Sequence, residues 1–405
     1  MTRTDSKRVT DPATPTRDEM LARARALVPA IRERATEAES LRRLPDATIR
    51  DLHATGLWRI NQPARVGGPQ LDYQLLVEIS SEFARACGST GWVFVNLAVH
   101  HWMLAMWPRA GQDRVWGENP DALIASAVIY PCGQARASGD HYVLSGRWPF
   151  CSGIMHSEWA MLGGMVRRAE GADAPPEPRM FLVPRSALEV IDTWNVAGLA
   201  ATGSHDVACK DLELPAYMTV AARDVRGDLT PGSAVNPGPL YRQSVAALFP
   251  HLIASLVIGM AQDMYDQTIE RFGAATSLSS KSPIAEHGTI QSRVAEAGAQ
   301  IDAARLLLHK GFGESLRLAE AATVPPVADK LRWRRDGTYA AVLASTAGTS
   351  LFRAAGGNAI RLANSMQRHL RDINAAMGHF HVNWDANSAA YGRVAMGLPP
   401  ENPNI

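Results

Sequence analysis

The sequence predicts an α+β fold that is mainly α, because the periodicity of its apolar residues changes twice along the chain. Residues 16–118 and 238–400 carry apolar residues at helical spacing. Residues 119–222, which lie between them, hold short runs rich in β-forming residues that Gly, Pro and Asp interrupt. We therefore expect an N-terminal helical domain, a small central β-barrel or sandwich, and a C-terminal four-helix bundle.

The N-terminal domain is predicted to surround one buried helix with shorter ones. "LPDATIRDLHATG" begins beside a proline and stops at Gly56, which is the usual asymmetry of a short helix. The run "TGWVFVNLAVHHWMLAMWP", residues 90–108, is apolar on nearly all sides. A helix of that composition is normally enclosed by protein.

The central segment is predicted to form an antiparallel sheet. "GDHYVLSGRWPF", "SEWAMLGGMV" and "VACKDLELP" have the length and composition of strands and are separated by turn-forming residues. The polar stretch "RRAEGADAPPEPR", residues 167–179, is expected to be a surface loop between strands. A connector rich in Gly and Pro, at 223–237, then leads into the C-terminal helices.

The composition argues against nucleic-acid and membrane functions. The chain has 405 residues, with 41 Lys and Arg against 40 Asp and Glu, so its formal charge is only +1. The polar N-terminus lacks the apolar centre of a signal peptide, and the longest apolar stretch, 252–261, is too short to span a bilayer. No dinucleotide fingerprint or Walker loop is present in the sequence. The cysteines are scattered without a C-x-x-C motif, and we expect reduced thiols in a cytoplasmic protein at Cys87, Cys132, Cys151 and Cys209.

The stretch "GHFHVNWD", residues 378–385, is the most conspicuous group of polar side chains near the C-terminus. The surrounding sequence predicts one helix that continues to Leu398, where Gly and two Pro residues close it. On such a helix His379 and His381 are about 200° apart and point to opposite faces. That spacing does not make a two-histidine metal face, and we expect no metal here. The residues alone leave open whether either histidine is a catalytic base, a core residue or a solvated one.

The order of the three segments resembles the acyl-CoA dehydrogenase fold over essentially the whole chain. "WNVAGLAATGSHDVACKDLELP" is similar to the stretch of that superfamily around a TGS turn and the strand after it, and "RHLRD" at 368–372 is similar to its arginine–aspartate motif. Many dehydrogenases of this fold carry a proton-abstracting glutamate nine residues before the final aspartate. This chain has Ala363 there, and alanine cannot accept a proton. The usual acyl-CoA dehydrogenation is therefore not expected.

Further motifs resemble one subgroup, the oxygenase components of two-component flavin-dependent monooxygenases (group D). They are "CGSTGWV" with "AVHHW", "GRWPFCSGIMHSEW", and a Gly-His pair that ends six residues before an aspartate near the C-terminus. The chain departs from the subgroup's pattern at Ala200 and at His101. Members of the subgroup hydroxylate phenols, steroid-derived phenols, indoles and related heterocycles, or amino sugars.

The resemblance implies a reaction and a set of partners. Reduced flavin (FADH2 or FMNH2) comes from a separate NAD(P)H:flavin reductase, reacts with O2 and gives a flavin hydroperoxide that hydroxylates a small aromatic substrate. The expected assembly is a cytoplasmic homotetramer. Two enzymatic alternatives remain, an FAD enzyme similar to acyl-CoA dehydrogenase and a flavin-dependent N-hydroxylase. The non-enzymatic alternative is a helical scaffold with an inactive flavin site. The sequence names neither the substrate nor FMN over FAD.

The resemblance also assigns flavin-binding roles to individual residues. Ser152 is expected to hydrogen-bond the central ring of the flavin, and Gly153 allows the backbone to approach it closely. Trp148 and Phe150 are expected either to line the ring pocket or to pack in a core. The remaining expected cofactor contacts are the turn Thr202, Gly203 and Ser204, and Arg271, Gly356 and Gly357, which meet the cofactor of a neighbouring subunit.

Histidines and one tryptophan are expected at the substrate. His100 is placed beside the polar group of the substrate, with Trp92 and His101 as further substrate contacts, although a buried core histidine is the plain alternative for His100. His379 is the expected catalytic histidine, because histidine titrates near neutrality and can take a phenolic proton. A second way of counting the register selects His381 instead, and both stay open at this point.

Overall fold

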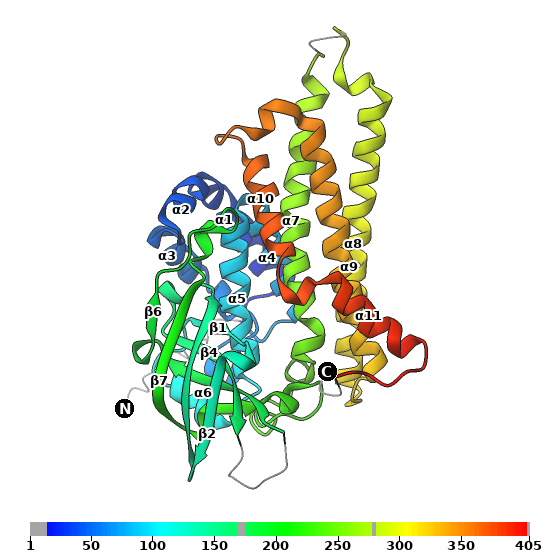
Figure 1. The fold of residues 1–405 in the computed structure, drawn as a ribbon. Helices are drawn as coiled ribbons and strands as arrows, with labels where there is room; N and C mark the ends of the chain where they lie inside the picture. Colours follow the sequence, from blue (N-terminus) through cyan, green and yellow to red (C-terminus); the bar gives the residue numbers. More distant parts are fainter. Residues whose placement is uncertain (1–13, 168–174, 278–280, 403–405) are drawn as a thin grey trace, which may run out of the picture.

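A computed structural model of the chain describes residues 14–167, 175–277 and 281–402. The predicted loop at 167–179 falls partly outside these ranges. Figure 1 shows N-terminal helices and a β unit, residues 124–221, packed beside a tall helical bundle. The predicted α+β class, mainly α, is confirmed.

The N-terminal helices are built around one buried helix, as the apolar run predicted. They are α1 (Arg17–Glu33), α2 (Ala35–Leu41), α3 (Asp46–Thr55), α4 (Tyr73–Ala86), α5 (Gly88–Leu104) and α6 (Arg109–Trp116). α1 begins with a capping box in which the Thr16 hydroxyl accepts from the backbone N–H of Glu19 and the Glu19 carboxylate accepts from the backbone N–H of Thr16. In α5 every residue is buried except Asn96.

The β unit is one mixed sheet, and the expectation of a purely antiparallel one is wrong. Its strands are β1 (Ile124–Ala127), β2 (Gly133–Ser138), β3 (His141–Cys151), β4 (Trp159–Arg167), β5 (Glu177–Pro184), β6 (Glu189–Ile191), β7 (His205–Pro215) and β8 (Thr219–Ala221). The strand order is β6-β7-β3-β2-β4-β5-β8, and β1 also pairs with β4. Both β1 and β2 run parallel to β4.

The two parallel pairings arise because β1 and β2 are two parts of one interrupted strand that lies beside β4. β1 pairs with residues 159–162 of β4, and β2 pairs with residues 165–167 further along the same strand. A short 3₁₀ turn at Tyr130–Cys132 separates the two parts and contains Pro131. Proline cannot donate a ladder hydrogen bond, so the strand breaks there and resumes in the same direction.

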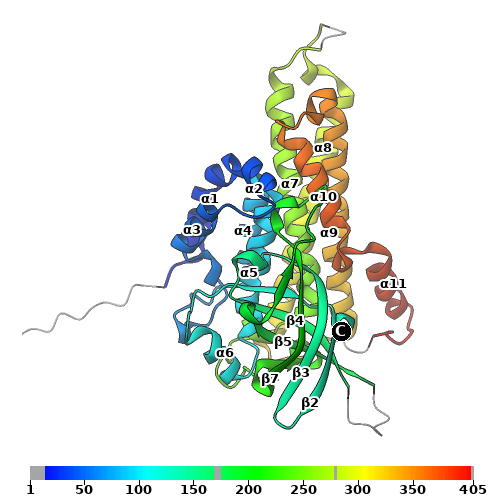
Figure 2. The ribbon, with the colours of Figure 1, turned by 60° about the vertical axis from the view of Figure 1, so that its left-hand side comes forward.

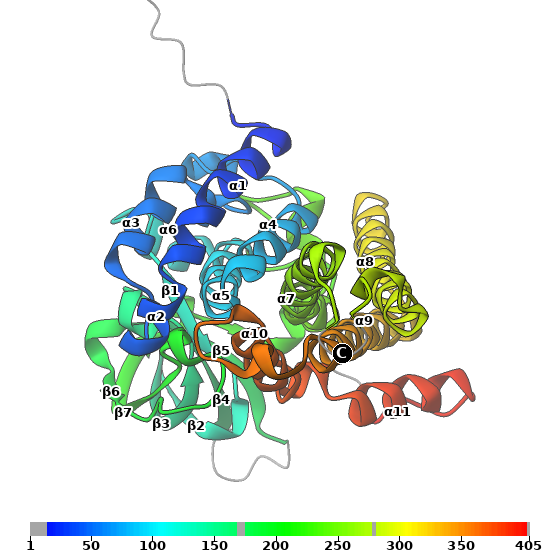
Figure 3. The same ribbon diagram turned by 90° about the horizontal axis from the view of Figure 1, so that it is seen from above.

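The C-terminal part is a bundle of α7 (Val245–Ala274), α8 (Gly288–Glu320), α9 (Val327–Ala355) and α10 (Ser365–Met377). Figure 3, seen from above, places α7 between α4 and α5 on one side and α8 and α9 on the other. Among the described residues, α7 is the one helix long and apolar enough to cross a membrane by length and composition. However, 83% of its apolar window is buried inside the protein, which is the environment of a core helix.

The last predicted helix is wrong, because the chain leaves helical geometry at Gly378. His379 is extended, with φ −75° and ψ 136°, and a 3₁₀ turn, Phe380–Val382, follows. A separate helix, α11 (Trp384–Ala395), begins after Asn383, whose side chain accepts from the backbone N–H of Ala386 at 2.9 Å. Figure 2 shows α11 projecting from the side of the bundle.

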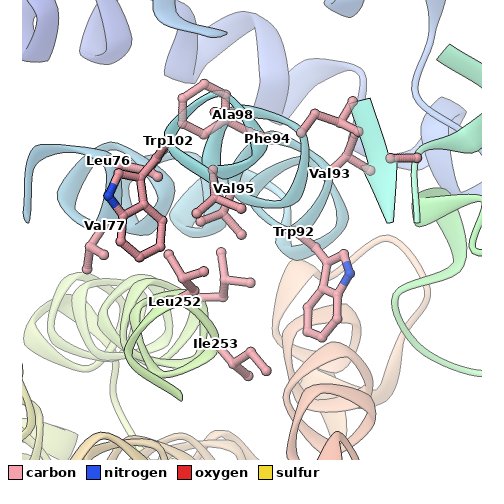
Figure 4. Close-up of a cluster of buried hydrophobic side chains, with 14 of the residues drawn as sticks. Leu76, Val77, Trp92, Val93, Phe94, Val95, Ala98, Trp102, Leu252 and Ile253 are labelled. Carbon is pink, nitrogen blue, oxygen red and sulfur yellow. The ribbon is translucent and has the colours of Figure 1, made fainter. Parts of the chain in front are cut away.

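The core joins the N-terminal helices to the bundle through α5. Figure 4 shows Trp92 and Val95 of α5 facing Leu252 and Ile253 of α7. Gly91 lies where α5 meets both α4 and α7, because an added Cβ would come 2.9 Å from the Cβ of Ala84 in α4 and 3.0 Å from Cδ2 of Leu256 in α7. This contact fixes α5, which carries several of the predicted site residues.

Candidate active site

Three hydroxyl groups from two separate segments meet beside α5. Ser152 follows the end of β3, whereas Thr202 and Ser204 belong to the turn before β7. Ser204 Oγ lies 2.8 Å from Ser152 Oγ and 2.7 Å from Thr202 Oγ1. The backbone N–H of Gly153 donates to Thr202 O at 2.9 Å and holds the two segments together. We call Ser152, Thr202 and Ser204 the hydroxyl cluster.

The glycines of these two segments adopt backbone conformations that favour glycine. Gly153 has φ +71° and Gly203 has φ +53°, both in the left-handed region. An added Cβ at Gly153 would also lie 3.1 Å from Leu97 of α5. The sharp turns at these positions therefore place Ser152 and Ser204 side by side against α5.

Trp92 connects the hydroxyl cluster to the C-terminal histidines. Its indole N–H donates to Ser152 Oγ at 3.0 Å. The centre of its ring system lies 5.6 Å from that of His379, in an edge-to-face arrangement. The structure thus brings the predicted residues Ser152, Trp92 and His379 into one site, although they are distant in the sequence.

His379 and His381 lie on the same side of the chain, contrary to the prediction of opposite faces. Their rings are stacked with centroids 5.4 Å apart and planes 20° apart. The backbone N–H of His381 donates to Nδ1 of His379 at 3.2 Å. In neutral His379 the ring proton is therefore on Nε2, so the free side of the ring offers a hydrogen-bond donor.

His381 is placed differently in spite of this stacking. Its ring lies 4.5 Å from that of Phe249, and its backbone carbonyl accepts from the side chain of Asn387 at 2.9 Å. Burial, the neighbouring His379 and Arg334 hold the pKa of His381 well below its ordinary value. These contacts are those of a packed histidine that supports the turn.

We expect the hydroxylation rate not to change through a titration of His379 between pH 6 and 9. Burial lowers the pKa of His379 to about 4, so the ring is neutral throughout this range. Single-turnover product formation with pre-reduced flavin is measured across this range for the wild type and for His379→Gln. The pH profile of the wild type should show no inflection that is missing from the profile of the variant. An inflection near pH 6.5 that disappears in the variant would contradict this assignment.

The free ring nitrogen of His100 is a hydrogen-bond acceptor, whereas that of His379 is a donor. Its Nδ1 lies 2.6 Å from the carbonyl oxygen of Ile124 in β1 and must donate to it, because a carbonyl only accepts. Its Nε2 therefore carries a lone pair, and this atom is buried without a hydrogen-bond partner among the described residues. Burial lowers the pKa of His100 to about 4, so the ring stays a neutral acceptor.

His101 does not share this position, and its side chain contacts protein residues on another face of α5. Successive helical residues point about 100° apart, so His101 faces away from β1. Its Nδ1 accepts from the indole N–H of Trp116 at 3.1 Å, and its ring stacks on that tryptophan. It is fully buried, and burial lowers its pKa to about 3.

The two aromatic residues that flank Ser152 have separate roles. Trp148 is fully buried in the β unit, and its indole N–H donates to Gly163 O at 2.6 Å, which favours the second of its two expected roles, packing in a core. Phe150 is 61% exposed and has φ +64°, an unusual conformation for a non-glycine residue. The bulge between Trp148 and Cys151 turns the Phe150 ring out of the sheet core.

Arg271, Gly356 and Gly357 form a second group at the other end of α10. Arg271 Nη1 donates to Ala355 O at 3.3 Å, directly before the two glycines. Gly356 has φ +65° and, like Gly357, has no atom within 4 Å of an added Cβ. The 13 residues of α10 extend about 20 Å between this group and His379. Within one chain these residues therefore do not join the hydroxyl cluster.

Three residues to which the sequence analysis assigned no role in the site also belong to it. Ser126 of β1 forms a bridge with Ser152, and Asn96 donates to Trp92 O at 2.9 Å. Asp372 of α10 accepts from the backbone N–H of Leu199 at 2.6 Å and so holds the turn that carries Thr202. The available signal for Asn96 was a polar residue inside an apolar run, and for Asp372 it was the motif "RHLRD", whereas Ser126 gave no signal.

We expect Asp372→Asn to stabilise the fold at pH 8 by up to about 3 kcal/mol. Burial raises the pKa of Asp372 from 3.8 to about 6, whereas in the unfolded chain it returns to its ordinary value. The stability that the protonated carboxyl contributes is fully present below about pH 4 and is lost as the pH rises through about 6. Asparagine keeps the acceptor for Leu199 and carries no charge.

Urea unfolding at pH 4 and at pH 8 measures this effect, with Asp385→Asn on the exposed part of α11 as the control. The increase in the free energy of unfolding of Asp372→Asn over the wild type should be small at pH 4 and larger at pH 8. The control should change little at either pH. A loss of stability at pH 8 would show that the folded protein stabilises the ionised carboxylate of Asp372, and that its pKa is not raised.

Comparison with known proteins establishes the class to which this fold and site belong. Residues 14–116 match the family model "Acyl-CoA dehydrogenase, N-terminal domain", and residues 251–384 match "Acyl-CoA dehydrogenase, C-terminal domain". The predicted acyl-CoA dehydrogenase fold is confirmed.

Full-length relatives narrow this class. The chain is 34% identical over 380 residues to the flavin-dependent monooxygenase oxygenase subunit HsaA of Rhodococcus jostii, covering 94% of this chain and 98% of the relative. It is 32% identical to the oxygenase component of an FADH(2)-dependent resorcinol hydroxylase of Rhizobium sp., covering 94% and 95% of the two chains. The crystal structure of HsaA from M. tuberculosis superposes with a TM-score of 0.90 at 32% identity over 96% of this chain and 100% of that one. The chain belongs to the family of flavin-dependent monooxygenase oxygenase subunits, and its cofactor is reduced flavin used with O2.

Proposed function

We propose that this oxygenase hydroxylates a small phenolic or related aromatic compound held between His100 and His379, with reduced flavin against Ser152. The observation that carries the proposal is the position of Trp92. Its indole N–H reaches Ser152 and its ring meets His379, so one side chain borders both halves of the site. A flavin and a substrate placed on these two halves would be neighbours.

The residues around Ser152 suit a flavin ring. Such a ring carries nitrogen and carbonyl groups along one edge, and the hydroxyl cluster offers oxygens that can bond them. Phe150 exposes an aromatic face beside this edge. Bound reduced flavin supplies two electrons and activates O2, so that one oxygen atom enters the substrate and the other leaves as water.

Two neutral histidines of opposite polarity suit a phenol. The lone pair on His100 Nε2 can accept a hydrogen bond from the phenolic O–H, which would give this buried atom the partner it lacks. The N–H on His379 Nε2 can donate to the same oxygen and stabilise the negative charge that gathers there as the ring is attacked. The expected general-base role of His379 is thus replaced by that of a hydrogen-bond donor.

The position that holds the catalytic base in many dehydrogenases of this fold cannot serve as a base in this chain. Ala363 lies on an exposed turn before α10 and has no side-chain proton acceptor. N-hydroxylation is the remaining alternative. A panel of phenols, indoles and amino sugars, supplied with NADH, flavin and a reductase, separates these possibilities by product mass. Ring hydroxylation of phenols supports the proposal, and an N-hydroxylated amine as the preferred product would overturn it.

The oxygenase is expected to consume no NADH by itself. Its relatives carry the name of an oxygenase component, and its own sequence has no dinucleotide fingerprint. Mixing the pure protein with NADH and oxidised flavin should leave the absorbance at 340 nm constant until a reductase is added. Steady NADH loss without a reductase would contradict the two-component arrangement.

The assembly that we propose is a cytoplasmic homotetramer. Arg271, Gly356 and Gly357 lie together at the end of α10 that is away from His379, about 20 Å along that helix. An arginine fork suits a phosphate, so this group can serve the flavin of a neighbouring subunit. Arg271→Ala should then weaken flavin binding without changing the mass of the subunit assembly in light scattering.

A further inference from the structure

We propose that the hydroxyl cluster is a one-way hydrogen-bond relay that leaves Ser152 as an acceptor only, and that Ser204 is the positioning residue that fixes this polarity. The inference rests on the proposed placement of flavin against Ser152. It follows from the order of the hydrogen-bond contacts Trp92–Ser152–Ser204–Thr202–Leu199.

The two ends of this series determine the direction of every bond in it. At one end, the indole N–H of Trp92 can only donate, and it lies 3.0 Å from Ser152 Oγ. At the other end, the carbonyl oxygen of Leu199 can only accept, and Thr202 Oγ1 donates to it at 2.9 Å. All members between the ends are buried, so competing water is excluded.

Each hydroxyl has one proton, so the directions propagate from the Leu199 end. Thr202 donates its hydroxyl proton to the carbonyl oxygen of Leu199. Ser204 must therefore donate to Thr202 at 2.7 Å. With that proton committed, the 2.8 Å contact between Ser152 and Ser204 requires Ser152 to donate. Ser152 then has no free proton, and its oxygen keeps one unused lone pair beside the one that Trp92 occupies.

This polarity distinguishes the two redox states of a flavin ring. The central ring of reduced flavin carries an N–H at the position where oxidised flavin carries a nitrogen lone pair. A Ser152 oxygen that only accepts complements the N–H, and it faces the lone pair of the oxidised ring with another lone pair. The relay therefore favours reduced flavin over oxidised flavin and also retains a ring that keeps this N–H during the reaction with O2.

Removing the acceptor for the Ser152 proton should abolish the preference for reduced flavin that the relay provides. In Ser204→Ala the Ser152 hydroxyl is free to turn and donate to oxidised flavin, while its oxygen can still accept from reduced flavin. Thr202→Val should act alike, because Ser204 can then donate to Ser152 when oxidised flavin is bound and can still accept from Ser152 when reduced flavin is bound. A second variant that reaches the same result by another residue keeps the inference testable if one of them folds poorly.

The experiment measures dissociation constants of FMN and FAD, oxidised in air and reduced under anaerobic conditions, together with the midpoint potential of the bound flavin. Ser204→Ala and Thr202→Val should tighten binding of oxidised flavin by about tenfold, the effect of one hydrogen bond, and change reduced flavin little. The midpoint potential should fall accordingly. Ser204→Thr, which keeps the hydroxyl, should restore wild-type values, and Ser157→Ala is the control for a nearby hydroxyl that bonds only Gly153 O.

The other outcomes overturn distinct claims. Equal weakening of both redox states in Ser204→Ala and Thr202→Val would show that the cluster is only a scaffold, and the relay would be rejected. Unchanged affinity for both states in Ser152→Ala would show that flavin does not contact Ser152, which would reject the proposed placement of the cofactor as well.

Discussion

His379→Ala should lower the single-turnover rate of hydroxylation by about 10²–10³, which is the typical loss when one donor to a developing oxyanion is removed. The donor is the N–H on Nε2, whose position follows from the bond between the backbone N–H of His381 and Nδ1. Product formation after mixing pre-reduced flavin, enzyme and phenol with O2 measures the rate. Flavin affinity should change little, because the ring of His379 faces Trp92 and not the hydroxyl cluster.

Two further variants separate a donor from a general base. His379→Gln keeps an N–H donor but has no basic nitrogen, so it should recover a large part of the rate, whereas a lost base would leave it as slow as His379→Ala. His381→Ala is the matched control, since its ring packs on Phe249 and supports the turn. If His381→Ala is the slow variant and His379→Ala is not, the assignment of the two histidines is reversed.

Ser152→Ala should keep the fold and uncouple oxygen use from hydroxylation. Loss of this hydroxyl removes the proposed contact with the flavin ring and leaves the Trp92 N–H without its acceptor. A hydrogen bond between neutral groups contributes about 0.5–1.5 kcal/mol, so the ratio of product to hydrogen peroxide should fall by about 2- to 10-fold.

Coupling is measured as moles of product and of hydrogen peroxide per mole of reduced flavin oxidised. Ser157→Ala removes a hydroxyl of similar burial nearby and should leave coupling intact. Coupling in Ser152→Ala equal to that of the wild type would remove Ser152 from the flavin site, whatever the effect on stability.

The fold could be predicted largely from the sequence because its long helices have strong periodicity. The run around Trp92 is apolar on all sides, and it forms the buried helix α5 at the centre of the molecule. The parallel pairing of β1 with β4 could not be predicted, since it depends on which distant strand lies beside an interruption at Pro131. Pairing partners are a tertiary property that local composition does not encode.

The sequence predicted which residues lie together in the candidate site better than it predicted how their side chains are arranged. Ser152, Ser204 and Trp92 were expected near the flavin or the substrate on the strength of their motifs, and the structure brings them within hydrogen-bond distance. The break at Gly378 was missed because an uninterrupted helix and a turn share the same residues there, and the difference changes where His379 and His381 point.

Sequence patterns do not predict which side-chain atoms donate hydrogen bonds and which accept them. The tautomer of His100 is set by the carbonyl oxygen of Ile124, and that of His379 by the backbone N–H of His381. Burial then lowers the pKa of both rings to about 4, which removes the titration near neutrality on which a general-base role would depend. Each of these effects requires knowledge of which atoms surround the ring.

A single-turnover reaction with isotopic oxygen tests the central claim most directly. The protein, pre-reduced with one equivalent of FMN or FAD and supplied with a phenol, is mixed with ¹⁸O₂ in the absence of NADH and reductase, and the product is analysed by mass. The account predicts a ring-hydroxylated phenol with one ¹⁸O atom, formed at close to one mole per mole of flavin oxidised. Hydrogen peroxide alone across a panel of phenols, or a product whose new oxygen comes from water, would contradict it.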